Sequence, residues 1–224
     1  MIWVVGGTSG IGAACASLLE PLHDGGVIRT GHEVDVRSPD ALFHFLAEQR
    51  PGIGAHITHL IYSAGVNELE WSMKQDAERA LDIYNTNVIG LLNVLQLLPT
   101  VERVVVVGSD AAWREMRTSV AYCASKAALH QAVRVIARER ASDEFAINVV
   151  APGMTEPTGM QEYVDARVPV IRHWEPEDAR RYEESQIPMR RRAHVHEVAS
   201  VIVSVLLMPT NYLNGAIIPV NGGR

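Results

Sequence analysis

Short apolar runs alternate along the chain with longer stretches in which apolar residues recur at the spacing of an α-helix. Short apolar runs bounded by turns are typical of strands buried on both faces, and helices between them are typical of a parallel sheet. The pattern predicts strands at Ile2–Val5, Gly26–Thr30, His59–Ser63, Arg103–Gly108, Ala146–Ala151 and Ala216–Val220. It predicts helices at Ile11–Leu22, Pro39–Arg50, Asp76–Leu98, Ser119–Ser142 and His196–Leu207.

This alternation predicts an α/β fold, with a doubly wound, mostly parallel sheet that carries helices on both faces. Because the pattern contains no repeat, we expect residues 1–224 to form one domain. The stretch 154–192 breaks the rhythm, since it combines several prolines with acidic and arginine clusters. Long excursions of this kind are typically functional or disordered, and we expect a substrate lid in preference to a merely solvated insertion.

The composition favours a globular protein that acts on small molecules. Apolar residues make up 47% of the 224 residues and charged residues 21%, which excludes disordered, collagen-like and coiled-coil proteins. The net charge of −6 argues against binding to nucleic acid or an anionic membrane, and no apolar stretch approaches the roughly 18 to 20 residues that span a bilayer. With only Cys15 and Cys123 and no export signal, we expect a cytoplasmic protein without disulfides or a metal site.

A glycine-rich turn joins the first predicted strand to the first predicted helix. Gly6, Gly10 and Gly12 allow a tight bend and let a diphosphate approach the backbone N–H groups at the helix N-terminus. The turn therefore predicts dinucleotide binding, although glycines at this place in many α/β proteins serve packing alone. The predicted contacts are Gly6, Thr8, Ser9, Gly10, Ile11 and Gly12.

The end of the second predicted strand bears on the choice of coenzyme. An acid there would bind the free ribose 2′-hydroxyl of NAD, and Gly31 stands where that acid is expected. Since Arg29 or His32 could accept a 2′-phosphate instead, the sequence favours NADP over NAD, while Glu33 keeps NAD open. Asp35–Val36 is either a contact to the adenine ring or an ordinary exposed turn.

The candidate proton-transfer group is a tyrosine with a lysine four residues later. Tyr122 and Lys126 would share one helix face, where the ammonium lowers the pKa of a phenol whose usual value is about 10. Alone, this spacing is more typical of an ordinary surface helix. Ser109 changes that reading, because it follows a buried strand at the sheet edge where ligands bind and can hydrogen-bond a substrate carbonyl. Asn87 lies in the helix before that strand.

Together these residues resemble the short-chain dehydrogenase/reductase family over essentially the whole chain, which implies a Rossmann fold. Gly6–Gly12 resembles its TGxxxGxG turn, with Val5 in place of threonine. Ser63-Ala64-Gly65 resembles the end of its NNAG motif, with Tyr62 and Ser63 in place of both asparagines. Asn87, Ser109, Tyr122 and Lys126 match its catalytic tetrad, Pro152-Gly153 its PG turn and Asn221-Gly222-Gly223 its terminal NGG.

The resemblance implies a role for each member of the tetrad. Tyr122 would be the general acid or base, and Ser109 would support the substrate oxygen. Lys126 would bind the nicotinamide ribose and lower the pKa of Tyr122, and Asn87 would anchor a relay water. Coenzyme contacts would also include Ser63, Ala64, Gly65, Tyr122, Lys126, Pro152, Gly153 and Thr155, besides His32, Asp35 and Val36.

The implied activity is NAD(P)-dependent interconversion of a secondary alcohol and a ketone by hydride transfer, in a homodimer or homotetramer. The main alternative is a non-catalytic dinucleotide sensor of the same fold, against which the complete tetrad argues. An epimerase or dehydratase would need a further C-terminal domain, and an enoyl reductase a wider spacing of tyrosine and lysine.

Two histidines, an arginine run and several aromatic and other side chains are expected to have mainly structural roles or to line the substrate pocket. His194 and His196 are expected to be capping or solvated residues, and Arg190–Arg192 a solvated rim of the lid. Candidate pocket residues, each equally compatible with ordinary packing, are Trp113, Arg114, Met154, Tyr163 and Trp174.

Overall fold

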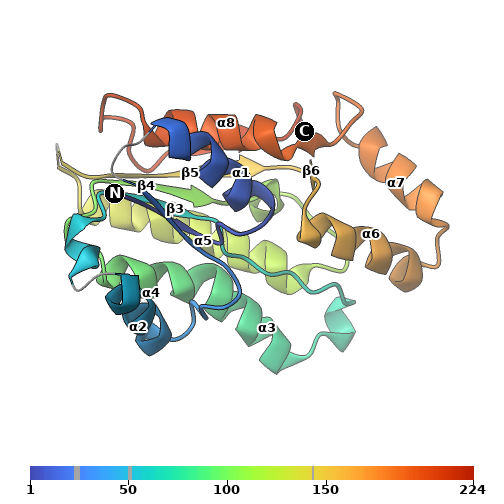
Figure 1. Cartoon of the computed structure of the whole chain (residues 1–224). Coiled ribbons are helices and arrows are strands. Elements are labelled where there is room, and N and C mark those ends of the chain that lie inside the picture. Colours follow the sequence, from blue (N-terminus) through green and yellow to red (C-terminus); the bar gives the residue numbers. More distant parts are fainter. Residues whose placement is uncertain (23–25, 50–51, 143) are drawn as a thin grey trace.

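The structure, a computed structural model, describes residues 1–22, 26–49, 52–142 and 144–224. Within these ranges six parallel strands form one sheet in the order β2-β1-β3-β4-β5-β8 (Figure 1). They are β1 (Ile2–Val5), β2 (Val27–Thr30), β3 (His59–Tyr62), β4 (Arg103–Val107), β5 (Ala146–Pro152) and β8 (Ile217–Val220). All the predicted strands are confirmed, with ends that agree to within one residue.

Helices cover both faces of the sheet (Figure 1). On one face lie α1 (Gly10–Leu19) and α8 (Val195–Leu206), and on the other lie α2 (Pro39–Gln49), α4 (Gly90–Gln96) and α5 (Val120–Glu139). Alternate side chains of β1 show how the core divides. Ile2 and Val4 join the apolar cluster beneath α1 and α8, whereas Trp3 and Val5 join the opposite cluster. Burial on both faces explains why the strands read as unbroken apolar runs.

Each of the five predicted helices is found at its predicted place, but one of them is divided and several ends differ. α1 ends at Leu19 and continues as a 3₁₀ turn, Glu20–Leu22. The predicted helix at Asp76–Leu98 consists of α3 (Ala77–Tyr84), one π-helical turn (Asn85–Ile89) and α4. α5 ends before Ser142, and Arg50, the predicted end of α2, lies outside the described residues.

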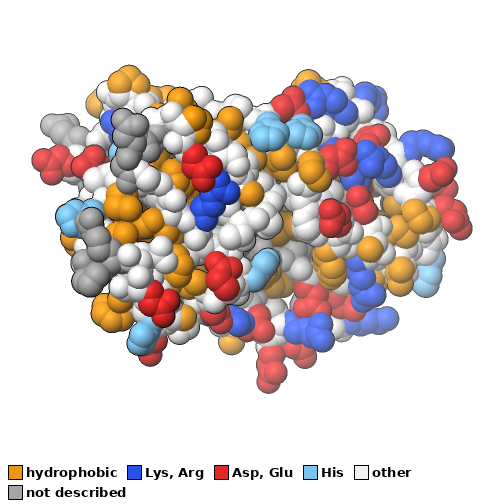
Figure 2. Space-filling view, viewed as in Figure 1, with side chains coloured by type: hydrophobic (Ala, Val, Ile, Leu, Met, Phe, Trp, Pro, Cys, Tyr) orange, Lys and Arg blue, Asp and Glu red, His pale blue; other side chains and the backbone are white. Residues whose placement is uncertain are grey.

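Residues 154–192 lie outside the six-stranded sheet, as expected, but they are mostly helical. β6 (Thr155–Glu156) pairs with β7 (Ala193–His194), and between them run α6 (Gly159–Arg172) and α7 (Pro176–Ser185). The Thr158 hydroxyl caps α6 by accepting the N–H of Gln161 at 3.0 Å, and Pro176 occupies the first turn of α7. Figure 2 shows Arg, Asp and Glu side chains crowded over these two helices.

Arg192 corrects the expectation of a solvated arginine rim. Its side chain is fully buried, and its guanidinium pairs with Asp165 at 2.6 Å, Glu183 at 2.9 Å and Glu156 at 3.2 Å. These acids come from α6, α7 and β6. Because one planar guanidinium offers five N–H donors, it can bridge acids from three elements at the point where the segment folds back on itself.

The two histidines behave as expected of capping residues. His194 caps α8, since its Nδ1 accepts the N–H of His196 at 3.4 Å. Glu197 completes the arrangement by accepting the N–H of His194 at 2.8 Å.

Candidate active site

The candidate site lies at the carboxyl edge of the sheet, where the strand order reverses between β1 and β3. Gly6 follows β1 and Ser63 follows β3, and Ser63 N–H donates to the carbonyl of Val5 at 2.8 Å. Gly6 has a φ of +77°, and a Cβ at this position would stand 2.7 Å from the backbone nitrogen of Ala64. Glycine is therefore required where the two segments touch, and open parallel sheets bind their ligands at such a reversal.

The glycine turn and the start of α1 fit the diphosphate of a dinucleotide. Gly10 has a φ of +51°, and a Cβ at Gly12 would stand 2.1 Å from the carbonyl oxygen of Gly6. The side chain of Ser9 forms no capping hydrogen bond, and the first turn of α1 holds no acid. The backbone N–H groups in the first turn of α1 therefore form the positive end of the helix, which favours binding of an anion. Thr158 of the segment 154–192 lies beside this turn, 3.4 Å from the place of a Cβ at Gly10.

Lys126 and Asn87 meet at Gly65, just after β3. A Cβ at Gly65 would stand 3.4 Å from both the Nζ of Lys126 and the Oδ1 of Asn87. The buried ammonium of Lys126 donates to the carbonyl oxygen of Val107, at the end of β4, at 3.0 Å. Two tetrad residues from different helices therefore lie at one point of the carboxyl edge, beside the predicted coenzyme contacts.

Asn87 holds the segment that follows β3. It lies in the π-helical turn, and such turns occur frequently at functional sites. Its Oδ1 accepts the N–H of Val66 at 2.8 Å, while its Nδ2 donates to the Val66 carbonyl at 3.0 Å and to the Ser125 hydroxyl at 2.9 Å. The fully buried amide is thereby fixed on both sides.

Ser109 and Tyr122 form the second half of the tetrad. Both are buried, and their side chains share a hydrogen bond. The Ser109 hydroxyl also accepts the N–H of Ala111 at 3.2 Å, which fixes its oxygen at the end of β4. The ammonium of Lys126 lies 5.7 Å from the centre of the Tyr122 ring. The structure therefore brings Asn87, Ser109, Tyr122 and Lys126 together.

The structure does not show the lowering of the Tyr122 pKa that Lys126 was expected to produce. Burial raises the pKa of Tyr122 to about 12, while the Ser109 hydrogen bond acts in the opposite direction and is outweighed. Lys126 has lost its own hydration, which lowers its pKa to about 8, and its ammonium donates to a carbonyl oxygen. The phenol is protonated at neutral pH, as a tyrosine with the usual pKa of about 10 would also be, and its raised pKa makes it a weaker acid.

The carboxylate of Glu33 lies against Gly31, at the end of β2, where the sequence itself has no acid. The Glu33 carboxylate accepts the N–H of Gly31 at 2.6 Å. A Cβ at Gly31 would stand 2.8 Å from Glu33 Oε2 and 2.0 Å from the Thr8 hydroxyl. Of the two basic candidates for a 2′-phosphate, Arg29 is paired with Glu20, and His32 is exposed.

Asp35 and Val36 lie beside this end of β2. The guanidinium of Arg37 binds the Asp35 carboxylate at 2.9 Å and holds the pKa of that carboxyl below its usual value. Val36 is buried, and its carbonyl accepts a hydrogen bond from Asn93 Nδ2 at 3.0 Å.

The PG turn follows β5 and contacts the C-terminal tail. Gly153 N–H donates to the Val220 carbonyl at 3.0 Å, and the Thr155 hydroxyl donates to the Gly153 carbonyl at 3.1 Å. Asn221 in turn hydrogen-bonds Asp110, a buried acid next to Ser109 whose pKa is raised by burial. Pro152, Gly153 and Thr155 therefore lie on the same edge as the tetrad.

Helix α6 is anchored to the loops that follow β3 and β4. The Tyr163 hydroxyl accepts the N–H of Leu69 at 3.1 Å, and Arg172 Nη2 donates to the carbonyl of Arg117 at 2.8 Å. Leu69 also belongs to an apolar cluster with residues of α6 and α7. The segment 154–192 is thus packed against the loops that carry the site.

The other candidate pocket residues have partners or lie toward solvent. Arg114 pairs with Asp110 at 3.4 Å, and the Trp174 ring packs edge-on against Tyr182 at 5.2 Å. Trp113 is about half-exposed, and Met154 is half-buried.

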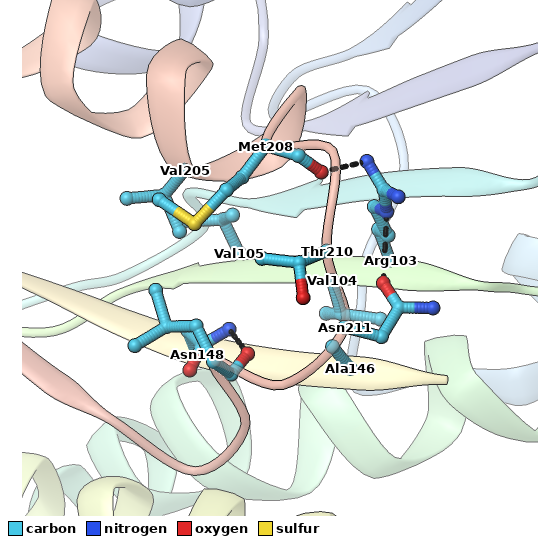
Figure 3. A pocket seen from close by; sticks show the side chains of 10 residues that line it. Arg103, Val104, Val105, Ala146, Asn148, Val205, Met208, Thr210 and Asn211 are labelled. Carbon is cyan, nitrogen blue, oxygen red and sulfur yellow. Dashed lines mark hydrogen bonds between the residues drawn. The ribbon is translucent and has the colours of Figure 1, made fainter. Parts of the chain in front are cut away.

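Two hollows lie away from the tetrad. The first, at the amino ends of β4 and β5, encloses about 10 Å³ beside Arg103, which donates to Asn211 at 3.0 Å (Figure 3). This volume suits at most a single water molecule. The second, of about 230 Å³, lies between α6 and α7 and is lined by Val168, Ala179 and Glu183, among others. Neither includes a residue of the tetrad.

The sequence interpretation missed two buried residues of α5 that support the tetrad. Ser125 lies three residues after Tyr122 and binds Asn87, and His130 lies four residues after Lys126 and accepts the N–H of Ser109. Both spacings place these side chains near the tetrad face of the helix, so helical periodicity is the signal that could have found them. Among the described residues, no helix combines the length and apolar character needed to cross a bilayer.

Sequence comparisons match the chain to known reductases. A family model described as enoyl-(acyl carrier protein) reductase matches residues 7–224. The 3-oxoacyl-(acyl-carrier-protein) reductase of Pseudomonas aeruginosa is 26% identical over 226 residues, which cover 98% of this chain and 86% of that protein. The corresponding reductase of Mycobacterium bovis is 28% identical over 240 residues, which cover 99% of this chain and 91% of that protein.

Solved structures share the fold. A short chain dehydrogenase family protein of Francisella tularensis superposes with a TM-score of 0.87 at 21% identity, covering 99% of this chain and 97% of that one. The ligand-free aldohexose dehydrogenase of Thermoplasma acidophilum gives a TM-score of 0.83 at 21% identity, covering 99% of this chain and 92% of that one.

Proposed function

Because the chain belongs to the short-chain dehydrogenase/reductase family and is an NAD(P)-dependent oxidoreductase, we propose that it interconverts a ketone and a secondary alcohol by hydride transfer. The observation that carries the proposal is the meeting of Asn87, Ser109, Tyr122 and Lys126 beside the glycine turn. Relatives named as 3-oxoacyl reductases support a ketone as the group that reacts.

In this proposal each side chain has a defined part in the reduction. A bound nicotinamide coenzyme supplies the hydride. The Tyr122 phenol donates its proton to the ketone oxygen, and the Ser109 hydroxyl hydrogen-bonds the same oxygen as negative charge develops there. Lys126 holds the coenzyme ribose, and Asn87 fixes the segment at Val66 and anchors a relay water. The protonated phenol is the form that ketone reduction requires.

The coenzyme is proposed to be NADP or NAD, bound along the glycine turn and the segments after β3 and β5. The absence of an acid at Gly31 supports NADP. Glu33 supports NAD as the second candidate, because its carboxylate lies against the N–H of Gly31, where an acid would bind a free 2′-hydroxyl and repel a phosphate.

The segment 154–192 is proposed to be a substrate lid. Its support is the position of α6, which is anchored to the loops after β3 and β4, and of Thr158, which lies beside the glycine turn. A cover in this place would exclude water from the reacting atoms.

We also propose a homodimer or homotetramer in the cytoplasm. Helix α5 carries exposed apolar or small residues at Val120, Ala124, Ala127 and Val135, whose spacing places them along one stripe of the helix. A second copy of the chain is the proposed occupant of this surface. Cys15 and Cys123 are free thiols, which supports a reducing compartment.

The test follows the consumption of NADH or NADPH with a panel of ketones that includes a 3-oxoacyl thioester. In Tyr122→Phe the hydroxyl is lost, so turnover should fall by about 10²- to 10⁴-fold while coenzyme binding is retained. Tyr212→Phe is the control, since Tyr212 is 99% exposed.

An unchanged rate in Tyr122→Phe would overturn the assignment of the proton donor. Tight coenzyme binding by the native chain without turnover of any ketone or alcohol would favour the dinucleotide sensor.

A further inference from the structure

His130 is a buried histidine that the proposed reaction does not use. It lies on α5, one helical turn after Lys126 and two turns after Tyr122, and it is 4% exposed. A buried polar ring needs a partner for its hydrogen-bonding nitrogen, because an unmade hydrogen bond in the interior is costly.

The partner is the backbone of Ser109. The N–H of Ser109 donates to Nε2 of His130 at 3.4 Å. A Cβ at Gly108 would stand 2.2 Å from the same nitrogen, so the imidazole fills the space that a side chain at position 108 would occupy. The ring centre also lies 5.7 Å from the ring centre of Trp113, on the loop that follows Ser109. The imidazole is therefore packed against the chain on both sides of Ser109.

This hydrogen bond requires one protonation state and one tautomer of the imidazole. Nε2 can accept a hydrogen bond only when it carries no proton, so the ring must be neutral with its proton on Nδ1. Burial lowers the pKa of His130 to about 4, and the nearby Lys126 ammonium lowers it further in the same direction. The acceptor is consequently maintained throughout the neutral range.

We propose that His130 is a positioning residue for Ser109: its Nε2 holds the Ser109 peptide and thereby helps to aim the Ser109 hydroxyl at the substrate oxygen that receives the Tyr122 proton. The inference rests on the proposed function, which gives the Ser109 hydroxyl its role. His130 itself does not touch the reacting atoms.

The effect should fall on the chemical step and leave coenzyme binding unchanged. Without the acceptor, the Ser109 N–H stays buried and unpaired, and the Ser109 hydroxyl is held only by its contacts with Ala111 and Tyr122. Since Ser109 supports the oxygen only as charge develops, its misplacement should lower kcat.

The experiment compares two substitutions at one position. His130→Leu fills the same space with an apolar side chain but removes the acceptor, and kcat should fall about tenfold with the KM for coenzyme unchanged. His130→Gln can place its Oε1 near the position of Nε2, and it should recover most of that loss. His44→Leu, on the exposed surface of α2, should keep the native rate.

A readout independent of turnover is nitrogen NMR of the His130 ring in the native chain. We expect a neutral ring with its proton on Nδ1 and slow exchange of the Ser109 amide proton. Equal kcat values for the Leu and Gln variants, or a proton on Nε2, would overturn the inference. If the native chain turns over no substrate, the proposed function fails, and the NMR measurement still decides whether His130 holds Ser109.

Discussion

At Gly31 the absence of a side chain makes room for an acid from two residues further along. Glu33 occupies that place by accepting the N–H of Gly31 at 2.6 Å. Arg29 is already paired with Glu20, which competes with a 2′-phosphate for the hydrogen bonds that its guanidinium donates. One carboxylate therefore opposes the preference for NADP that the sequence suggests.

Glu33→Gln should shift the balance between the two coenzymes. Loss of the charged hydrogen-bond acceptor should weaken NADH binding by about tenfold, and removal of the repulsion should strengthen NADPH binding. Fluorescence titration with each reduced coenzyme measures both effects. Glu48→Gln, on the exposed side of α2, removes the same charge elsewhere and should change neither affinity. Equal affinities in native chain and Glu33→Gln would exclude Glu33 from the adenosine site.

The sequence predicts where the tetrad residues lie better than it predicts their ionisation. The spacing of Tyr122 and Lys126 correctly places both on one helix face, but it carries no information about burial. Burial dominates here, since it raises the pKa of the phenol and lowers that of the ammonium. The hydrogen bond from Ser109 to His130 is similarly hidden, because it depends on a glycine at position 108.

Among the elements, strands were more predictable than the segment 154–192. Strands buried on both faces leave an apolar run in the sequence, as Arg103–Val107 does after its first residue. The helices α6 and α7 lack that signal because much of their surface is charged. α7 nevertheless carries start signals, with Pro176, Glu177 and Asp178 in its first turn, that indicate a helix. The π-helical turn at Asn85–Ile89 leaves no mark on a 3.6-residue period.

Arg192 should govern the stability of the segment 154–192. Its replacement in Arg192→Met leaves the carboxylates of Glu156, Asp165 and Glu183 without their shared partner, and Glu183 is itself buried. We expect a loss of about 2 to 4 kcal/mol in the free energy of unfolding and faster proteolysis within the segment. Denaturant unfolding and limited proteolysis measure these effects.

Arg191→Met is the matched control, since the neighbouring Arg191 pairs with Glu197 at the surface. Ion pairs at the surface contribute little to the free energy of unfolding, so this variant should keep native stability and protease resistance. Equal behaviour of the two variants would show that the buried ion-pair cluster does not hold the segment in place.

For the whole molecule, the proposed oligomer makes a separate prediction. Val135→Glu places a charge on the exposed apolar stripe of α5 and should convert a homodimer or homotetramer into smaller species. Light scattering during gel filtration measures the mass. Phe43→Glu, which changes a 60% exposed apolar residue on α2, should leave the mass unchanged. A native chain that runs as a monomer would contradict the proposal.

Two surfaces of α5 lie only one helix diameter apart, about 10 Å. The inward surface holds Tyr122, Lys126 and His130, and the outward one carries the stripe around Ala127. Because α5 is one continuous helix, a tilt that moves its outward surface also moves the side chains on its inward surface. In the proposed function, association of copies and proton delivery both depend on the position of α5, so dilution that separates the copies should also slow turnover.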